Sequence, residues 1–321
     1  MMARVLIPRA EPLLEPMVSQ RWPRRDVCGI LLFVKSPGLS SNESLQRVKR
    51  LYQARKAGHT GSLDRLATGL LPICFGEATK LSGFLLNADK CYRAIMKLGV
   101  VTTTGDAEGE VIRERPVADL DPARVAAVFR AMLGEQTQVP PMHSALKHRG
   151  QRLYELAHRG IAIERQPRPI VIHALDVVRF LGDALEITVR CSKGTYLRTL
   201  AEDIGEALGC GAHVAALERT AVGGFEARDA IDLCGLTELA STGLQALDAR
   251  LLPLDRVLPE EPTVALSRDA AYYLARGQAV LVAHAPRAGL VKLYDDRRRF
   301  LGVGEVQDDG RIAPRRLLRT A

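Results

Sequence analysis

One stretch of the sequence, Gly58–Gly69, constrains the chain more than any other. It holds three glycines, the imidazole of His59 and the carboxylate of Asp64. Glycines at this density suit a backbone that adopts positive φ or that a ligand approaches closely, although a surface loop is the ordinary interpretation. Asp64 is the only acidic residue between Glu43 and Glu77, so its carboxylate is either simply solvated or held ready for chemistry.

The size and charge of the chain narrow the class of protein. With 321 residues, 47% of them hydrophobic, the chain can bury a full core, and we expect more than one domain. The formal net charge of +8 favours a polyanionic partner, either nucleic acid or an anionic membrane surface. No apolar run in the sequence approaches the roughly 20 residues that a membrane-spanning helix needs. We therefore expect a soluble protein with no membrane partner.

The six cysteines and seven histidines lack the spacing of a metal site. The cysteines are scattered without a CxxC pair, and several fall inside apolar segments. No histidine lies one helical turn from another with a carboxylate at ligand spacing. We expect no metal site and no disulfide framework, but buried thiols in a reducing, cytoplasmic compartment.

The N-terminal part of the chain predicts an extension, two strands and a helix. Residues 1–26 carry arginines and prolines without periodicity, which indicates a flexible basic extension. The apolar run at residues 29–34 predicts a buried strand. Ser40 and Glu43 match a capping box and open a helix. Residues 92–98 alternate in polarity, which is typical of a strand with one wetter face.

A basic segment follows the helix that Asp121 is expected to cap. Residues 143–168 contain only two acidic residues, and prolines stand at both ends. We interpret residues 140–168 as an insertion that projects from the core and contacts phosphates. A solvated charged face would have the same composition.

Two further strands are predicted at residues 170–180 and 185–191, and an amphipathic helix starts at Leu197. Arg198 then lies in the first helical turn, where the helix dipole disfavours a cation. We expect a carboxylate that is distant in the sequence to face it. A surface pair with Glu202, four residues further on, is the alternative.

Beyond Pro259 the composition changes to short strand-like pieces. A module of about sixty residues buries a small core, so it should pack against its neighbour. We predict a β-rich module at residues 259–321, with one helix near 269–276 and strands at 263–266, 280–283, 290–294 and 300–306.

Five sequence blocks together resemble the TruB family of bacterial pseudouridine synthases, which act on uridine 55 of tRNA. In chain order they are Gly58–Asp64 with Ala67–Gly69, Pro72–Lys80, Ser144–Lys147, Cys191–Arg198 and Gly209–His213. The resemblance runs from about Gly29 to Leu318 and implies an α+β pseudouridine-synthase fold. A catalytic domain at residues 27–255 would hold a mixed, largely antiparallel sheet flanked by helices, and residues 259–321 would form a PUA-like RNA-binding domain. One departure is Arg65, where the family usually has proline, which fixes φ.

The resemblance also implies a reaction and the residues that perform it. Asp64 would be the catalytic carboxylate in breaking and re-forming the glycosidic bond of a flipped uridine, and Arg198 would be the cation that meets it. Tyr92 would stack on the target base and is a candidate for moving a proton. On pattern alone, the alternative for Tyr92 is a strand aromatic that lines the core. Tyr196 and Leu217 would complete the pocket around the base.

His59 and three lysines would hold the RNA. The resemblance implies that His59 occupies the place that the flipped base leaves, which recovers part of the unstacking cost. Without the resemblance, His59 would be interpreted as a polar loop residue. Lys80, Lys147 and Lys193 are expected to contact phosphates. No cofactor is implied, because the reaction is an isomerisation that oxidises nothing and carries no group.

Two functions remain open at this point. The first is an isomerase that converts uridine 55 in the T stem-loop of tRNA to pseudouridine. The second is a non-catalytic factor that binds the same loop and helps tRNA to fold. A guide-RNA-dependent synthase is a more distant alternative, which the insertion at residues 140–168 disfavours. We expect a monomer that recognises the shape of tRNA without a guide RNA.

Overall fold

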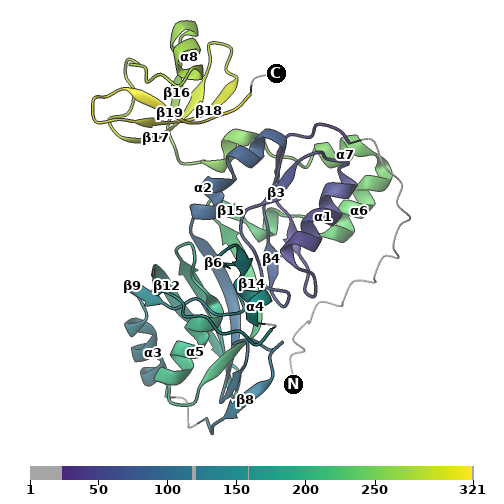
Figure 1. Ribbon diagram of the computed structural model, residues 1–321, viewed down its shortest axis with the longest axis vertical. Coiled ribbons are helices and arrows are strands. Elements are labelled where there is room, and N and C mark those ends of the chain that lie inside the picture. Colours follow the sequence, from purple (N-terminus) through teal and green to yellow (C-terminus); the bar gives the residue numbers. More distant parts are fainter. Residues whose placement is uncertain (1–23, 118–120, 158, 320–321) are drawn as a thin grey trace.

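The structure is a computed structural model that describes residues 24–117, 121–157 and 159–319. It consists of a body built around one large sheet and a smaller C-terminal module beside it (Figure 1). Most of the extension predicted at residues 1–26 lies outside the described residues. Arg25, near its end, is packed on the body, because its guanidinium donates to Asp248 at 2.6 and 2.7 Å and to the Tyr52 carbonyl at 2.9 Å.

The body is organised by an eight-stranded sheet. Its strands are β2 (Val34–Lys35), β4 (Thr68–Leu70), β6 (Lys90–Leu98), β9 (Gly134–Gln138), β12 (Arg168–Phe180), β13 (Ala184–Cys191), β14 (Ala212–Val222) and β15 (Phe225–Glu226). The order is β2-β4-β14-β6-β13-β12-β9, and β15 pairs with β14. Within the described part of this sheet, only β4 and β14 run parallel. The mixed, largely antiparallel sheet is therefore confirmed, as are the strands predicted at 92–98, 170–180 and 185–191.

The strand predicted at residues 29–34 is divided between two sheets. Its first part is β1 (Gly29–Leu31), which pairs with β5 (Ile73–Phe75), and β5 pairs in turn with β3 (Ala57–His59). Its last part enters β2 of the large sheet. Ile30, Leu31 and Phe33 are all buried, so an uninterrupted apolar run hides the point at which the chain changes sheets.

Helices cover the large sheet in two groups (Figure 1). Beside β3 lie α1 (Ser41–Leu51), α6 (Leu233–Thr242) and α7 (Leu244–Asp248), and near β12 lie α3 (Pro122–Ala131) and α5 (Leu197–Ala207). The predicted N-caps are confirmed, since Ser40 forms a capping box with Glu43 and Asp121 accepts from the Ala123 backbone N–H. In the described ranges, no helix is long and apolar enough to cross a membrane.

Shorter elements complete the body. They are α2 (Ser82–Asn87), α4 (Leu153–Ala157), the 3₁₀ turns η1 (Gly76–Lys80), η2 (Ala227–Asp229) and η3 (Leu254–Val257), the hairpin of β7 (Val100–Thr102) with β8 (Val111–Glu114), and the hairpin of β10 (Lys147–His148) with β11 (Gln151–Arg152). Within the basic segment, β10 and β11 are exposed, whereas Leu153 and Leu156 of α4 are buried. The segment predicted to project therefore exposes its hairpin but buries the apolar side of α4.

Burial of the thiols follows the prediction only in part. Cys74, Cys191 and Cys210 are buried, as expected from their apolar surroundings in the sequence. Cys28 and Cys234 are exposed, so the prediction is wrong for these two. Cys28 directly precedes β1, Cys234 is the second residue of α6, and Cys91 is half-buried.

The C-terminal module has one sheet and its own hydrophobic core. Its elements are β16 (Thr263–Ala265), α8 (Arg268–Ala275), β17 (Gly289–Tyr294), β18 (Phe300–Val306) and β19 (Ile312–Leu317), with strand order β16-β17-β18-β19. The strand predicted at residues 280–283 is wrong, since Val280 makes only an isolated bridge to Ile312. Strand β19, which was not predicted, forms that edge of the sheet beside Val280. Its sequence did not suggest a strand because it contains a proline and two arginines, but an edge position tolerates them.

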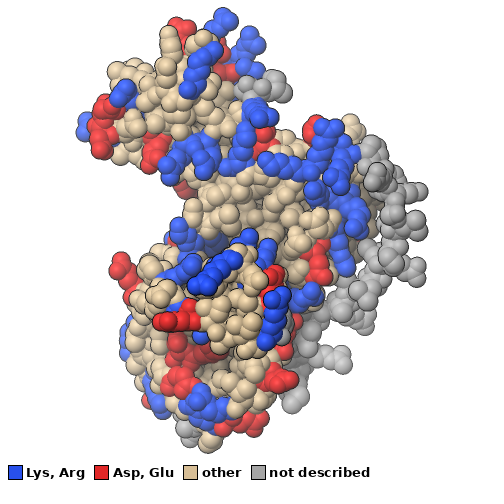
Figure 2. All heavy atoms as spheres, in the orientation of Figure 1, with Lys and Arg blue, Asp and Glu red and all other residues tan. Residues whose placement is uncertain are grey.

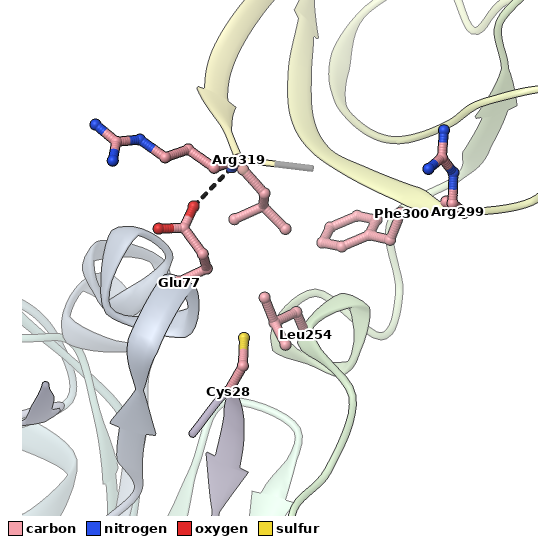
Figure 3. Close-up of a pocket in the computed structure, with 7 residues that line it drawn as sticks. Cys28, Glu77, Leu254, Arg299, Phe300 and Arg319 are labelled. Carbon is pink, nitrogen blue, oxygen red and sulfur yellow. Dashed lines mark hydrogen bonds between the residues drawn. The ribbon is translucent and has the colours of Figure 1, made fainter. Parts of the chain in front are cut away.

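The module packs on the body around a cavity of about 320 Å³. Figure 3 shows Cys28, Leu254 and Phe300 facing this space from both sides. At its edge, the backbone N–H of Arg319 donates to Glu77 Oε2 at 2.6 Å. Val303 of β18 also belongs to a core cluster of the body. The module thus docks through apolar packing and through polar contacts at the rim, as its small core requires.

Candidate active site

Asp64 stands on the loop that joins β3 to β4, within the glycine-rich stretch. The loop closes on itself, because the Ala67 N–H donates to the Asp64 carbonyl at 3.1 Å. Two of its glycines have positive φ, +117° at Gly61 and +98° at Gly69. A Cβ at position 69 would lie 2.3 Å from the Arg219 carbonyl oxygen, so only glycine allows this close approach to β14. The expectation of a backbone with positive φ is therefore confirmed at these two positions.

Arg198 lies in the first turn of α5 and forms a two-point ion pair with Asp64. Its Nε is 2.9 Å from Asp64 Oδ2, and its Nη2 is 3.2 Å from Asp64 Oδ1. The Arg198 side chain is 5% exposed, whereas that of Asp64 is 41% exposed. The carboxylate therefore opens to solvent in front of a buried cation. The predicted distant carboxylate is Asp64, and among the described ion pairs the alternative with Glu202 does not occur.

The remaining donors of Arg198 are also used. Nη1 donates to the Thr104 carbonyl at 3.0 Å, and Nη2 donates to the His143 carbonyl at 2.7 Å. The buried carboxylate of Asp106 lies 3.6 Å from Nε. Since a guanidinium has five N–H donors in a rigid fork, these contacts fix its plane. Arg198 thereby connects the Asp64 loop to the β7–β8 hairpin and to the start of the basic segment.

The groups around Asp64 have opposite effects on its pKa. Desolvation is the largest effect and raises the pKa of Asp64; Arg198 lowers it and Asp106 raises it again. The net result is a pKa above the ordinary value for aspartate. An ionised carboxylate with a raised pKa is a better proton acceptor and nucleophile than an ordinary surface aspartate.

Asp106 and Lys35 belong to this site, and the sequence analysis missed both. Asp106 accepts from the Thr104 hydroxyl at 2.5 Å and from the Glu108 N–H at 3.1 Å. The ammonium of Lys35 is buried and donates to the Arg65 and Ala67 carbonyls at 3.1 and 2.5 Å. The sequence held a signal for each: Asp106 is an acid in a loop rich in threonine and glycine, and Lys35 directly follows an apolar strand.

The predicted pocket residues lie on elements close to Asp64 and its loop. Tyr92 on β6 and Tyr196 just before α5 both interact electrostatically with Asp64, and burial raises the pKa of both phenols. Tyr92 also packs against the main core, so the two interpretations of this residue are compatible. Leu217 on β14 is 8% exposed, and its carbonyl accepts from the Thr68 hydroxyl at 3.4 Å. These side chains come from three elements that meet at the Asp64 loop.

His59 ends β3, at the entrance to the loop. Its Nδ1 is buried without a hydrogen-bond partner. Burial lowers the pKa of His59, and the positive charges of Arg219 and Arg152 lower it further. These effects favour the neutral form of the imidazole over the imidazolium.

The three lysines have different surroundings. Lys80 ends η1, where Nζ is 2.6 Å from Glu77 Oε2 and 3.4 Å from the Leu317 carbonyl, so it lies between body and module. Lys193 donates to Asn87 Oδ1 at 2.9 Å. Lys147 lies on the exposed β10–β11 hairpin.

Arg65 follows Asp64 directly and is tethered to the start of α1. Its Nη1 donates to the Gly38 carbonyl at 3.0 Å, and its Nη2 lies 3.2 Å from Glu43 Oε2. Its own carbonyl accepts from the Gly38 N–H at 2.9 Å. Several hydrogen bonds thus hold the loop at the position where the resemblance led us to expect a proline.

Among the described residues, no group of three or more histidine, cysteine or acidic side chains is arranged to hold a metal ion. The site thus combines the partly exposed carboxylate of Asp64 with a buried arginine, the buried carboxylate of Asp106 and neighbouring tyrosines. Such an arrangement suits acid–base or nucleophilic chemistry on one flat, uncharged group.

Comparisons with known proteins agree with this arrangement. The family described as "TruB family pseudouridylate synthase (N terminal domain)" matches residues 49–197, and two C-terminal TruB domain families match residues 198–259 and 262–318. A protein of Nitrosococcus oceani named tRNA pseudouridine synthase B is 57% identical over 300 residues, which cover 94% of this chain and 97% of that protein. The protein of the same name from Stutzerimonas stutzeri is 52% identical, over 95% of this chain and 100% of the relative.

The fold is also found among solved structures. One chain of the structure titled "Crystal Structure of a Cbf5-Nop10-Gar1 Complex" is similar with a TM-score of 0.68 and 25% identity, over 87% of this chain and 78% of that chain. The pseudouridine-synthase fold predicted from the five blocks is therefore confirmed. Given more than half of the residues identical to a relative over nearly the whole length of both proteins, the chain belongs to the TruB family of pseudouridylate synthases.

Proposed function

We propose that this protein is a tRNA pseudouridine synthase that converts uridine 55 in the T stem-loop to pseudouridine. The observation that carries the proposal is the two-point pair of Asp64 with Arg198, in which a partly exposed carboxylate is backed by a buried cation. The tRNA substrate is supported by relatives that are named tRNA pseudouridine synthase B. The position in tRNA follows from the family resemblance of the sequence blocks.

The proposed reaction is an isomerisation of one nucleotide. The bond from N1 of uracil to C1′ of the ribose breaks, the base turns, and C5 bonds to C1′. The hydrogen on C5 leaves as a proton and N1 gains one, so nothing is oxidised. One carboxylate suffices for this chemistry, whereas most glycosidases use a pair. Asp64 provides that carboxylate, and Arg198 keeps it oriented and opposes its protonation.

The aromatic and apolar side chains hold the flipped base. Tyr92 would stack on the uracil and move a proton, and Tyr196 and Leu217 would close the pocket against water. His59 would fill the position that the base leaves in the T loop. Base flipping explains why these residues surround a carboxylate that is open on one side.

A basic surface supports RNA as the substrate. Figure 2 shows Lys and Arg side chains across the middle of the body and along the underside of the C-terminal module. We assign residues 27–255 to catalysis, with Lys147 and Lys193 on phosphates, and residues 259–321 to a PUA-like RNA-binding domain. We further propose that the protein acts as a monomer without a guide RNA, because the basic segment of residues 140–168 can contact the substrate directly.

Release of tritium from a tRNA transcript labelled at C5 of uridine tests this function, because only bond formation at C5 releases that hydrogen. We expect release by the wild-type protein alone, none by Asp64→Asn, and none from a transcript with cytidine at position 55. Release that depends on an added RNA would show a guide-dependent enzyme. Binding of tRNA without any release by the wild type would instead support the folding factor.

A further inference from the structure

Arg219 on β14 is a buried guanidinium beside the proposed active site. Its side chain is among the largest that are fully buried, with 1% relative exposure. Within the described parts of the chain it forms no ion pair with a carboxylate. A buried cation without a carboxylate is costly unless its N–H groups are all hydrogen-bonded. The partners of Arg219 therefore indicate why a cation is kept at this position.

The guanidinium binds the backbone of the Asp64 loop on both sides of Asp64. Nε donates to the Leu70 carbonyl at 2.8 Å, Nη2 to the Gly61 carbonyl at 3.2 Å, and Nη1 to the Ser62 carbonyl at 3.5 Å. Gly61 and Ser62 precede Asp64, and Leu70 follows it. One rigid side chain thus fixes the distance between the two ends of the loop.

Burial has the larger effect on the Tyr92 phenol and raises its pKa, whereas the positive charge of the same guanidinium lowers it. Tyr92 lies directly opposite Arg219 in the antiparallel pairing of β6 with β14. Residues directly opposite each other extend their side chains from the same face of a sheet. Because an arginine can only donate, the Tyr92 oxygen is the atom suited to face it, with the phenol proton turned toward another acceptor.

We propose that Arg219 is a positioning residue that fixes the Asp64 loop and orients the Tyr92 hydroxyl, so that the Tyr92 proton faces the base. This inference rests on the proposed function of the site. It joins the two groups that would handle the substrate, Asp64 and Tyr92, through one buried cation. The charged or titratable groups around Tyr92 are Arg219, Cys191 and Asp64, and of these Arg219 is the one that donates to the backbone on both sides of Asp64.

The test uses full-length protein labelled with 3-fluorotyrosine, whose ¹⁹F resonances report the ionisation of each phenol. Tyr92→Phe identifies the Tyr92 resonance among those of the seven tyrosines. In Arg219→Met we expect Tyr92 to titrate at higher pH than in the parent protein, because a cation that stabilises the phenolate is lost. We expect the single-turnover rate on tRNA to fall about 100-fold, while Kd changes by less than about threefold.

Arg219→Lys and Arg25→Lys complete the design. Arg219→Lys keeps the positive charge but lacks the planar N–H donors of the guanidinium. We therefore expect it to lower the single-turnover rate, with a smaller change in the Tyr92 titration than Arg219→Met causes. It also remains measurable if Arg219→Met does not fold. Arg25 also donates to a backbone carbonyl, that of Tyr52, and its replacement by lysine should change neither quantity.

The proposal is overturned if the Tyr92 titration is unchanged in both Arg219 variants, or if Arg25→Lys lowers the rate as much as Arg219→Lys. A wild-type protein that releases no tritium would refute the proposed function instead. The ¹⁹F titration separates the two failures, because it reports the effect of Arg219 on the ionisation of Tyr92 without turnover.

Discussion

Asp64 and Arg198 are separated by 134 positions in the sequence, yet their side chains meet in parallel, with Arg198 Nε 2.9 Å from Asp64 Oδ2 and Nη2 3.2 Å from Oδ1. The buried arginine also donates to two backbone carbonyls, so its orientation is set by the protein and not by the carboxylate. Asp64 therefore aligns on a fixed guanidinium. A carboxylate aligned in this way has little freedom to lose when a substrate arrives.

Replacing Arg198 by lysine keeps the charge but removes this parallel geometry. We expect the single-turnover rate on tRNA to fall about 100-fold, as for a misplacement of a reacting group by about 1 Å. The matched control is Arg190→Lys, because Arg190 forms an exposed pair with Asp89 at 3.3 Å. An exposed pair contributes less than about 1 kcal/mol, so the control should keep its rate. A lysine variant as fast as wild type would contradict the positioning role of Arg198.

The charges that face Asp64 set its pKa and should therefore set the pH dependence of the reaction. They are those of Arg198, Asp106 and Lys35. The reaction needs the ionised carboxylate, so the rate is lost as the pH falls through the pKa of Asp64. Asp106 raises this pKa and Lys35 lowers it. Asp106→Asn should therefore move the acidic limb of the pH–rate profile to lower pH, and Lys35→Met should move it to higher pH.

The measurement is the single-turnover rate across the acidic pH range, which separates changes in pKa from changes in the limiting rate. Asp89→Asn is the control, since Asp89 pairs with His173 and Arg190 away from the site. If Asp106→Asn and Lys35→Met moved the acidic limb of the pH–rate profile in the same direction, the limb would report a group other than Asp64.

The sequence could predict the features that arise from local rules. The capping box at Ser40 and the proline-led helix after Asp121 depend on neighbours in the chain. The prediction that a distant carboxylate faces Arg198 also followed from its position in the first turn of a helix, where the dipole disfavours a cation. Identifying that carboxylate as Asp64 required the family resemblance, because the pair spans elements far apart in the sequence.

The buried cations could not be predicted for a physical reason. Lys35 and Arg219 bind backbone carbonyls, and every residue has a carbonyl, so no side-chain pattern marks their partners. Asp106 lies in a loop whose polar sequence is typical of solvent-exposed turns. The chain's change of sheet after Leu31 is hidden because both parts of the apolar run are buried.

Glycines 58 and 69 belong to the same stretch, and we expect different results when each is replaced by alanine. At position 69 the φ of +98° and the Cβ contact of 2.3 Å with the Arg219 carbonyl should lower the free energy of unfolding by about 3 kcal/mol or more. At position 58 nothing lies within 4 Å of the added Cβ, so Gly58→Ala is the matched control and should change stability by less than about 1 kcal/mol. Urea unfolding measures both, and equal losses would refute the steric account.

Arg65 offers a test of how the loop is held. Its side chain and that of Glu43 are 55% and 47% exposed, so their pair should contribute less than about 1 kcal/mol. The backbone contact of its carbonyl with Gly38, and that with Lys35, do not depend on the side chain. We therefore expect Arg65→Ala to keep its single-turnover rate within about threefold of wild type. A loss close to that of Arg198→Lys would show that the side chain, and not the backbone, holds the loop.

Lys80 and Lys147 carry the same charge in different surroundings, so they separate docking of the module from binding of RNA. Lys80 contacts Glu77 and the carbonyl of Leu317 in β19, whereas Lys147 lies on an exposed hairpin. Lys147→Ala should weaken tRNA binding and reduce the slope of log Kd against log salt by about 1, as loss of one phosphate contact does. Lys80→Ala should leave that slope unchanged and instead lower the midpoint of urea unfolding, because a partly buried ion pair at the interface is lost. Equal changes in slope for the two variants would show that Lys80 leaves Glu77 to bind a phosphate when tRNA is present.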